Sequence, residues 1–251
     1  MAFREITLLI THYNRSNSLE RLLKSLVNQE LFFGEIIVAD DGSNEQHLGH
    51  AKELANTYHF TLVESPVNQG LGHNLNMGQN AVKTPYTLYI QEDFVPTIGF
   101  KKVLEEALRL LLLDPGIDVV RFFANFGLPY TKPLTKDFSE LLVPFWGGNY
   151  NKVFAYSDNP HLRRSNFLEK FGPYREGIPG DRTEYHMCIS FIKHGGRAVL
   201  YNRFQSLFQH INTPGEESTM KRAQWKLKPN PFIDGLKYLY RQVRYNIDIR
   251  F

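Results

Sequence analysis

The chain has 251 residues, of which 42% are hydrophobic and 22% charged, and its formal net charge is +3. This composition is that of a globular protein with a sizeable core, and so small a net charge is by itself no argument for nucleic-acid binding. The single cysteine, Cys188, excludes an intramolecular disulfide and is expected to be an inert buried thiol inside a helix.

No apolar stretch is long enough to span a membrane, and the first apolar run, residues 6–10, is too short for a signal peptide core. We therefore expect a cytoplasmic protein. Peripheral contact with the inner face of a membrane is the alternative.

Strands and helices alternate through the first half of the chain. Strands are expected at residues 5–11, 35–39, 60–63 and 86–90. Helices are expected from a cap at Ser16 or Asn17 to about 27, through 48–55, and from the loop at 68–72 to about 82. The first helix has its apolar residues at the spacing of one face packed on a sheet. Such alternation predicts an α/β fold with a doubly wound, largely parallel sheet and right-handed crossovers.

The second half is less regular. A helix is expected at 100–113 and a strand at 118–123, followed by an irregular, aromatic-rich stretch with many glycines and prolines at 124–149. A further strand at 151–156, a short helix at 165–171, a loop at 172–180, a helix at 182–194 and a strand at 197–201 follow. The tail from residue 216 is expected to form two helices, broken at Pro229 and Pro231.

Polar and acidic residues follow the expected strands. They are Asn14, the pair Asp40 and Asp41, and the pair Glu92 and Asp93. Because ligands of open α/β sheets bind at the carboxyl ends of the strands, these side chains predict a site for a hard cation and, through it, phosphate. Simple turns, as at Asp41-Gly42, are the alternative. A glycine-rich turn is missing after the first strand, which argues against a dinucleotide fold or a P-loop.

Several segments at these places form an ordered series. They are Thr11-His12-Tyr13-Asn14-Arg15, Asp40-Asp41-Gly42-Ser43, Asn68-Gln69-Gly70 with Asn76-Met77-Gly78, and Gln91-Glu92-Asp93. This series resembles the motifs of family 2 glycosyltransferases. The resemblance covers about the first hundred residues and resumes over 172–210. It implies the GT-A fold, with a Rossmann-like, mostly parallel central sheet and helices on both faces, and inverting transfer from a nucleoside diphosphate sugar such as a UDP-sugar.

The resemblance also implies roles for individual residues. Thr11, Tyr13 and Asp40 correspond to residues that hold the nucleotide base or ribose, with Asp41 second to Asp40. The remaining predicted nucleotide-sugar contacts are Asn14, Arg15, Asn68, Gly70, Asn76, Gln91 and Glu92. Asp93 matches the second acid of the family's Asp-x-Asp motif, and His210 a further ligand of the divalent cation, Mn²⁺ or Mg²⁺. Gln91 stands at the first acid, a departure that leaves neutral hydrogen bonds or Glu92 in its place.

The general base is expected near a helix start in the later half. Glu184 is the first candidate and Asp181 the second, since the family's usual aspartate is replaced by Tyr185. Both acids could instead only favour the helix dipole. Trp146 is expected either to stack on an acceptor sugar or to lie in the core.

Residues 1–215 are thus expected to form the transferase domain, with a nucleotide-sugar half at 1–115 and an acceptor and base half at 116–215. Residues 216–251 would be a basic helical extension. Its apolar stripe of Phe232, Leu236, Leu239, Val243 and Ile247 is expected to pack on the domain, with an anionic membrane surface as the alternative.

The expected acceptor is a hydroxyl of a glycan or lipid-linked molecule in cell-surface polysaccharide synthesis, and no nucleic acid is expected as a partner. The rival functions are a non-catalytic nucleotide-sugar or glycan-binding module and a sugar nucleotidyltransferase.

Overall fold

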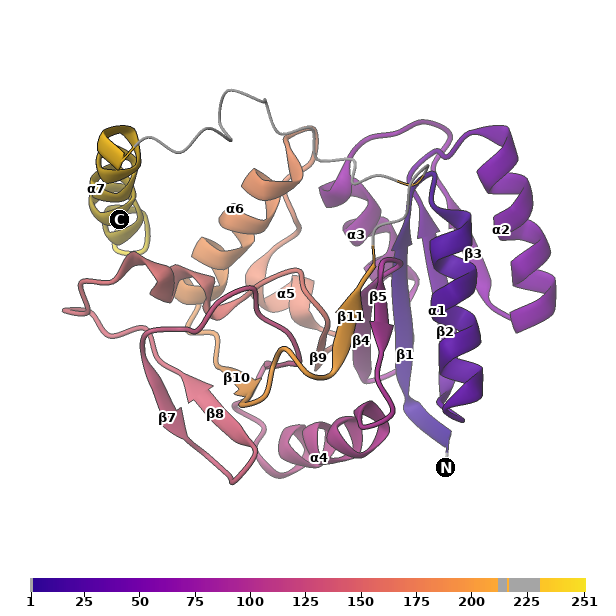
Figure 1. The fold of residues 1–251 in the computed structure, drawn as a ribbon, viewed down its shortest axis with the longest axis horizontal. Coiled ribbons are helices and arrows are strands. Elements are labelled where there is room, and N and C mark those ends of the chain that lie inside the picture. Colours follow the sequence, from indigo (N-terminus) through magenta and orange to yellow (C-terminus); the bar gives the residue numbers. More distant parts are fainter. Residues whose placement is uncertain (1, 212–215, 217–230) are drawn as a thin grey trace.

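The computed structural model describes residues 2–211, residue 216 and residues 231–251 (Figure 1). Within this part, a nine-stranded sheet has the order β3-β2-β1-β4-β9-β6-β10-β8-β7. Its strands are β1 (Ala2–His12), β2 (Phe32–Asp40), β3 (Thr61–Glu64), β4 (Tyr86–Gln91), β6 (Val119–Arg121), β7 (Thr131–Pro133), β8 (Phe138–Leu141), β9 (His161–Arg164) and β10 (Ala198–Tyr201). A separate two-stranded ribbon pairs β5 (Phe94–Pro96) with β11 (Phe208–His210).

The sheet is mostly parallel, as predicted. Strands β3, β2, β1 and β4 are parallel neighbours, and β10 is parallel to β6. Strand β9 is antiparallel to both of its neighbours, β4 and β6, and β8 to β10 and β7. Only β9 and β8 therefore run against the direction of the other strands in the described sheet.

Alternation along the strands divides the buried residues into two cores, one on each face of the sheet. In β1, Leu8 and Ile10 belong to one core and Leu9, between them, to the other. Because both faces are covered, the central parts of β1, β2 and β4 are rich in buried apolar residues, as in other buried parallel sheets.

Helices cover both faces of the sheet (Figure 1). The first core contains residues of α1 (Ser16–Asn28), α2 (Glu45–Tyr58) and α4 (Phe100–Leu113). The second contains residues of α3 (Leu71–Ala81), α5 (Phe167–Phe171) and α6 (Gly180–Lys193), including the buried thiol of Cys188. The predicted α/β class with helices on both faces is confirmed.

The strand predicted at 151–156 is wrong. Residues Tyr150–Ala155 form a 3₁₀ helix, η1, and the strand lies further along, at β9. Val153 and Ala155 are buried at the two-residue spacing of a strand, but the Asn149 side chain accepts from the Asn151 amide and starts a tight turn. Lys152 then donates to the Pro144 carbonyl oxygen, which fixes that turn against the preceding loop.

The stretch at 124–149 is not wholly irregular. Strands β7 and β8 form a hairpin at the edge of the sheet, where β8 pairs with β10. Both strands are short and carry polar residues, so their pattern is weaker than that of the central strands.

The last helix, α7 (Pro231–Asp248), packs on the domain through residues other than those predicted. Tyr245 contacts the rings of Tyr150 and Tyr185, with centroids 5.5 and 4.6 Å apart. The residues predicted to pack, Leu236, Leu239, Val243 and Ile247, are exposed instead. The side chain of Phe232, and the first of the two predicted tail helices, lie outside the described residues, and the division of the chain at residue 215 stays a prediction.

Candidate functional site

The register of the parallel strands brings the predicted site residues to one edge of the sheet. Thr11 pairs with Gln91, and His12 pairs with Asp40, at the carboxyl ends of β1, β4 and β2. The Thr11 hydroxyl lies 3.0 Å from the hydroxyl of Tyr89, a buried side chain of β4. The loops that leave these strand ends form the candidate site.

Asp40 connects the loop that follows β1 with the loop that follows β2 by hydrogen bonds. Its carboxylate contacts His12 Nδ1 at 2.6 Å and accepts from the Ser43 hydroxyl and amide. Burial opposes its ionisation, but these hydrogen bonds lower the pKa of Asp40 below its usual value. Asn14 adds a second clamp, since its amide donates to Ser43 Oγ and its side chain accepts from the Asn44 amide.

Asp41 holds the loop before α3. Its two carboxylate oxygens accept from the amides of Gln69 and Gly70 at 2.9 and 2.8 Å. Burial raises the pKa of Asp41 in spite of these bonds. Gly42, which follows, has φ +71° and lies against the backbone of Val67, so the loop leaves no room for a side chain.

Asn76 binds the loop between α5 and α6. Its side chain accepts from the Tyr174 amide and donates to the Tyr174 carbonyl and to Glu176. Asn68 is exposed and Tyr13 half-buried. The sequence motifs around Asp40, Asp41 and Asn76 therefore shape the walls of the site.

The centre of the site is a cluster of Asp93, Arg15, Glu92 and His210. Asp93 Oδ2 accepts from Arg15 Nη1 at 2.8 Å and lies 2.9 Å from His210 Nε2. Arg15 Nη1 is also 3.5 Å from Glu92 Oε1. The ribbon of β5 and β11 places His210, because His210 pairs with Phe94 and stacks on its ring at 4.7 Å.

The pKa values of the two acids of this cluster are shifted in opposite directions. Burial raises the pKa of Glu92 to about 8, and the neighbouring Asp93 charge adds to this. Burial also opposes ionisation of Asp93, but hydrogen bonds from His210 and Arg15 lower its pKa below the usual value. Asp93 is thus the acid that holds the negative charge.

The same cluster fits part of a divalent-cation site. Asp93 Oδ1 is buried and has no hydrogen-bond partner among the described residues. The imidazole of His210 lies beside it; carboxylate oxygen suits Mg²⁺ and Mn²⁺, and imidazole is a common ligand of first-row transition metals. Within the described part of the chain, however, no three acids, histidines or cysteines gather into a complete metal site. Asp93 and His210 could therefore hold a cation only together with ligands from a substrate or solvent.

Glu216 covers the start of α1 next to this cluster. Its carboxylate accepts from the amides of Asn17 and Ser18 and from the Ser18 hydroxyl, at 2.7–3.0 Å. Arg15, at the N-cap of α1, gives the helix no side-chain cap, so Glu216 caps it from about 200 residues away. Sequence reasoning missed this contact because Glu216 belongs to no motif.

Glu184 lies in a second acidic pair. Its carboxylate accepts from Ser157 Oγ at 2.7 Å and from the amide of Asp158 at 3.0 Å. Asp158 is buried, and burial together with the charge of Glu184 raises the pKa of Asp158 to about 7. Burial raises the pKa of the Tyr89 hydroxyl, the partner of Thr11, well above its usual value, and the neighbouring carboxyl of Asp158 adds to this.

Asp158 begins a buried polar chain beneath the site. Asp158 Oδ1 accepts from Tyr156 OH, which contacts Tyr174 OH, and Tyr174 OH accepts from Arg163 Nη1. Arg163 also donates to Gln79 Oε1 on α3. No motif marked Asp158 or Arg163, because the sequence motifs that carried the predicted resemblance lie outside residues 100–172.

The other predicted residues lie apart from these clusters. Asp181 is exposed and accepts from the amide of its neighbour Arg182. Trp146 is 86% exposed and contacts Phe145 and Arg250 at the far end of α7, so it is not in the core.

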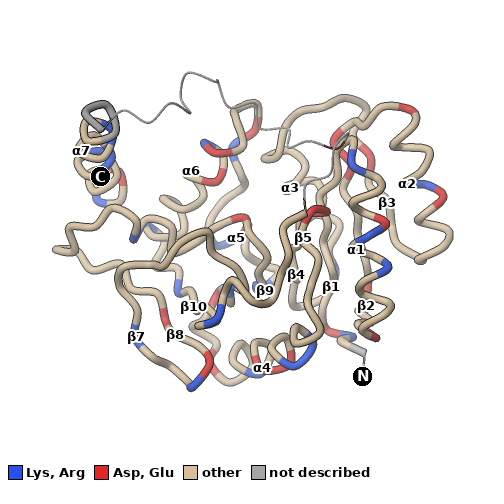
Figure 2. Tube along the Cα trace, viewed as in Figure 1, with Lys and Arg blue, Asp and Glu red and all other residues tan. Residues whose placement is uncertain are grey.

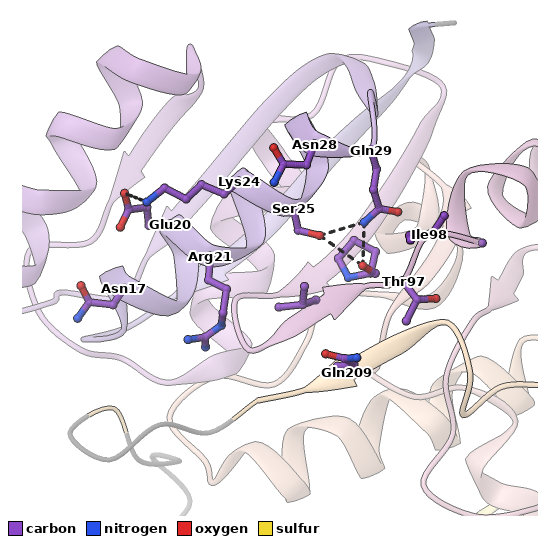
Figure 3. A pocket seen from close by; sticks show the side chains of 13 residues that line it. Asn17, Glu20, Arg21, Lys24, Ser25, Asn28, Gln29, Thr97, Ile98 and Gln209 are labelled. Atoms are coloured by element: carbon purple, nitrogen blue, oxygen red, sulfur yellow. Dashed lines mark hydrogen bonds and ion pairs between the residues drawn. The ribbon is translucent and has the colours of Figure 1, made fainter.

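A groove of about 940 Å³ is lined by residues of α1, of β5 and the turn after it, and by Gln209 (Figure 3). It lies between α1 and β5, where Gln29 and Ser25 donate to the Pro96 carbonyl oxygen. Among the predicted site residues none lines this groove. The acidic clusters, rather than the groove, therefore define the candidate site.

Comparison with known proteins gives consistent results. A model of glycosyl transferase family 2 matches residues 7–204. A cholesterol galactosyltransferase of Borreliella burgdorferi is 33% identical over 89 residues, which are 36% of this chain and 25% of that protein. The chain thus spans about a quarter of the length of this curated relative.

Solved structures show the same fold. Staphylococcus aureus TarS residues 1–349, in complex with UDP-GlcNAc, superposes with a TM-score of 0.62 at 14% identity, over 96% of this chain and 66% of that one. Glucosyl-3-phosphoglycerate synthase from Mycobacterium tuberculosis, in complex with Mg²⁺ and UDP, gives 0.58 at 19% identity, over 83% and 72%.

Proposed function

Because the chain belongs to glycosyl transferase family 2, we propose that it transfers a sugar from a nucleoside diphosphate sugar to an acceptor hydroxyl, with inversion at the anomeric carbon. The observation that carries this proposal is the cluster of Asp93, Arg15 and His210 beside the end of β4. An ionised acid with a buried, unpaired oxygen next to a cation and an imidazole suits a metal-bound diphosphate.

In this proposal Thr11, Tyr13 and the loops held by Asp40 and Asp41 receive the nucleotide. Gln91 and Glu92 would contact the donor by hydrogen bonds, with Arg15 balancing the acids in the free protein and facing the diphosphate in the complex. When bound to Asp93 and His210, a divalent cation would neutralise charge on the leaving diphosphate. Mg²⁺ with UDP, and UDP-GlcNAc, bound to the two solved relatives support these choices.

Glu184 is the proposed general base. Ser157 and the Asp158 amide both donate to Oε1, so this oxygen is oriented and Oε2 would be the one to accept a proton from the acceptor. Such a base contributes about 10²- to 10⁴-fold in rate. Asp181 is the second candidate, exposed at the start of α6.

The acceptor is proposed to be a hydroxyl of a glycan or lipid-linked molecule in cell-surface polysaccharide synthesis, at the cytoplasmic face of a membrane. Trp146 would contact the acceptor. These finer points rest on the sequence resemblance and on relatives such as the cholesterol galactosyltransferase, whose acceptor is a lipid by its name.

The test is calorimetric titration of UDP, GDP and CDP into the wild-type chain and Asp93→Asn, each with Mn²⁺ and with chelator. We expect one nucleotide to bind in the presence of metal, and the variant to lose at least about tenfold in affinity because it loses a charged ligand. Asp137→Asn is the matched control, since Asp137 pairs with Arg203 on the hairpin surface.

A transfer assay with the sugar donors of the nucleotide that binds, with anomeric configuration followed by NMR, then tests catalysis. Glu184→Gln should leave nucleotide affinity within about twofold and lower the transfer rate at least about 100-fold. Binding without transfer or donor hydrolysis would favour the non-catalytic module. If no nucleotide binds under any condition, the donor-site assignment is wrong.

A further inference from the structure

Helix α7 has two apolar faces, and the domain covers one of them. Tyr245 and Ile249 pack against the second core, near η1 and α6. The opposite side carries Leu236, Leu239, Val243 and Ile247, each between 49% and 61% exposed. We call these four residues the outer face of α7. A continuous apolar stripe of this kind on the surface usually marks an interaction site.

A loop next to the residues that follow α7 carries two further exposed aromatic side chains. Phe145 and Trp146 are 59% and 86% exposed, and Arg250 fixes their loop to the end of α7. The Arg250 guanidinium donates to the Phe145 carbonyl at 2.6 Å and lies 4.3 Å above the Phe145 ring. Exposed aromatic rings next to a basic side chain are typical of residues that sit at the headgroup level of a bilayer.

The charge on this part of the molecule is positive (Figure 2). The cations of residues 231–251 are Lys237, Arg241, Arg244 and Arg250, and the acids are Asp234 and Asp248. Asp248 is engaged by Tyr185 OH at 2.6 Å and lies 3.4 Å from Arg244. The surface therefore presents apolar side chains flanked by an excess of cations.

We propose that the outer face of α7, together with Phe145 and Trp146, docks on an anionic lipid bilayer. A helix with one apolar stripe and flanking cations lies in the plane of the interface. Among the described helices, none is long and apolar enough to cross a membrane, so α7 would lie on the surface. A second copy of the chain fits less well, because pairing two such faces would bring like charges together.

This inference deepens the proposed function and depends on it in one respect, the delivery of a lipid-linked acceptor. Tyr185, which follows Glu184 on α6, holds α7 through its hydrogen bond to Asp248 and its ring contact with Tyr245. Helix α7 is thus in direct contact with α6, the helix that carries the proposed base. A bilayer on its outer face would bring a lipid-linked acceptor to this side of the enzyme.

The test is sedimentation of the full chain with vesicles of phosphatidylcholine, alone or with 30% phosphatidylglycerol. We expect the partition coefficient to be at least about tenfold higher for the anionic vesicles, since each basic residue near the surface contributes about fivefold. Raising the ionic strength to 0.5 M should remove most of this difference. The triple variant Leu239→Ser/Val243→Ser/Ile247→Ser, and separately Phe145→Ser, should each lower binding at least about tenfold.

The matched control is Leu112→Ser/Leu113→Ser, which removes two exposed leucines at the end of α4, away from α7 (Figure 1). This control should bind like the wild type. The proposal is overturned if the wild type does not bind anionic vesicles, or if the triple variant binds equally well. It is also overturned if light scattering shows a dimer that the triple variant abolishes, which would assign the face to a second copy. Nucleotide titration of the same proteins, expected to be unchanged, tests the donor site separately.

Discussion

The buried carboxyl of Asp158 should make the protein less stable as the pH rises. Its folded-state pKa is raised to about 7 by burial and by the charge of Glu184, whereas in the unfolded chain it titrates near 3.8. Between these values the folded protein holds a proton that the unfolded chain has lost. The contribution of this group to the free energy of unfolding therefore falls with increasing pH.

The magnitude follows from this difference. Over the 1.5 pH units from 5.5 to 7, one proton difference at about 1.4 kcal/mol per unit amounts to about 2 kcal/mol. The substitution Asp158→Asn keeps the shape and the acceptor oxygen that faces Tyr156, but it cannot ionise. The free energy of unfolding of the variant, measured relative to that of the wild type, should therefore increase as the pH rises from 5.5 to 8.

The assay is thermal unfolding of both proteins at a series of pH values. For a chain of this length, 2 kcal/mol corresponds to a relative shift of about 4–8 °C in Tm. The surface variant Asp137→Asn, whose parent residue pairs with Arg203, should show no such trend. A Tm difference between Asp158→Asn and the wild type that stays constant from pH 5.5 to 8 would refute the reasoning, because Asp158 would then be ionised throughout.

Two further predictions concern the walls of the site. In urea unfolding, Glu216→Ala should lower the free energy of unfolding by about 1–2 kcal/mol, because the amides of Asn17 and Ser18 at the start of α1 lose their acceptor. An unchanged unfolding midpoint would show that the cap is not made in solution. Gly42→Ala should lower the free energy of unfolding by about 1–3 kcal/mol in the same assay and weaken nucleotide binding. The reason is that residue 42 has φ +71° and a Cβ there would lie 2.3 Å from the Val67 carbonyl carbon. If the variant binds nucleotide as tightly as the wild type, this loop is not part of the donor site.

The first hundred residues were predictable because their signals are local. In β1, β2 and β4 each strand is an apolar run that ends at a polar residue, and Asp40 and Gln91 stand where the runs stop. Parallel pairing then requires these ends to meet, which the register of Thr11 with Gln91 confirms. The α/β class of this half followed from the same alternation of strands and helices, whereas the sheet order comes from the structure.

The residues around the proposed base were not predictable in the same way. Arg163 is among the largest fully buried side chains, yet an arginine in a sequence indicates a surface position unless its partners are known. Those partners, Tyr174 and Gln79, lie 11 and 84 residues away. Strand β9 was missed for this reason, since two arginines in four residues, Arg163 and Arg164, conceal a central strand. Asp158 was missed with it.

Helix α7 shows a different limit of periodicity. Its residues repeat at the spacing of an amphipathic helix on two sides, through Leu239 and Val243 on one and Tyr245 and Ile249 on the other. Both stripes satisfy the pattern, so the sequence alone favoured the more aliphatic one for packing. The domain instead takes the aromatic side, because Tyr150 and Tyr185 offer rings at suitable distances and Asp248 accepts from the Tyr185 hydroxyl. A helix whose polar and aromatic contacts satisfy the domain is free to present its aliphatic stripe outward, which is the arrangement that docking on a bilayer requires.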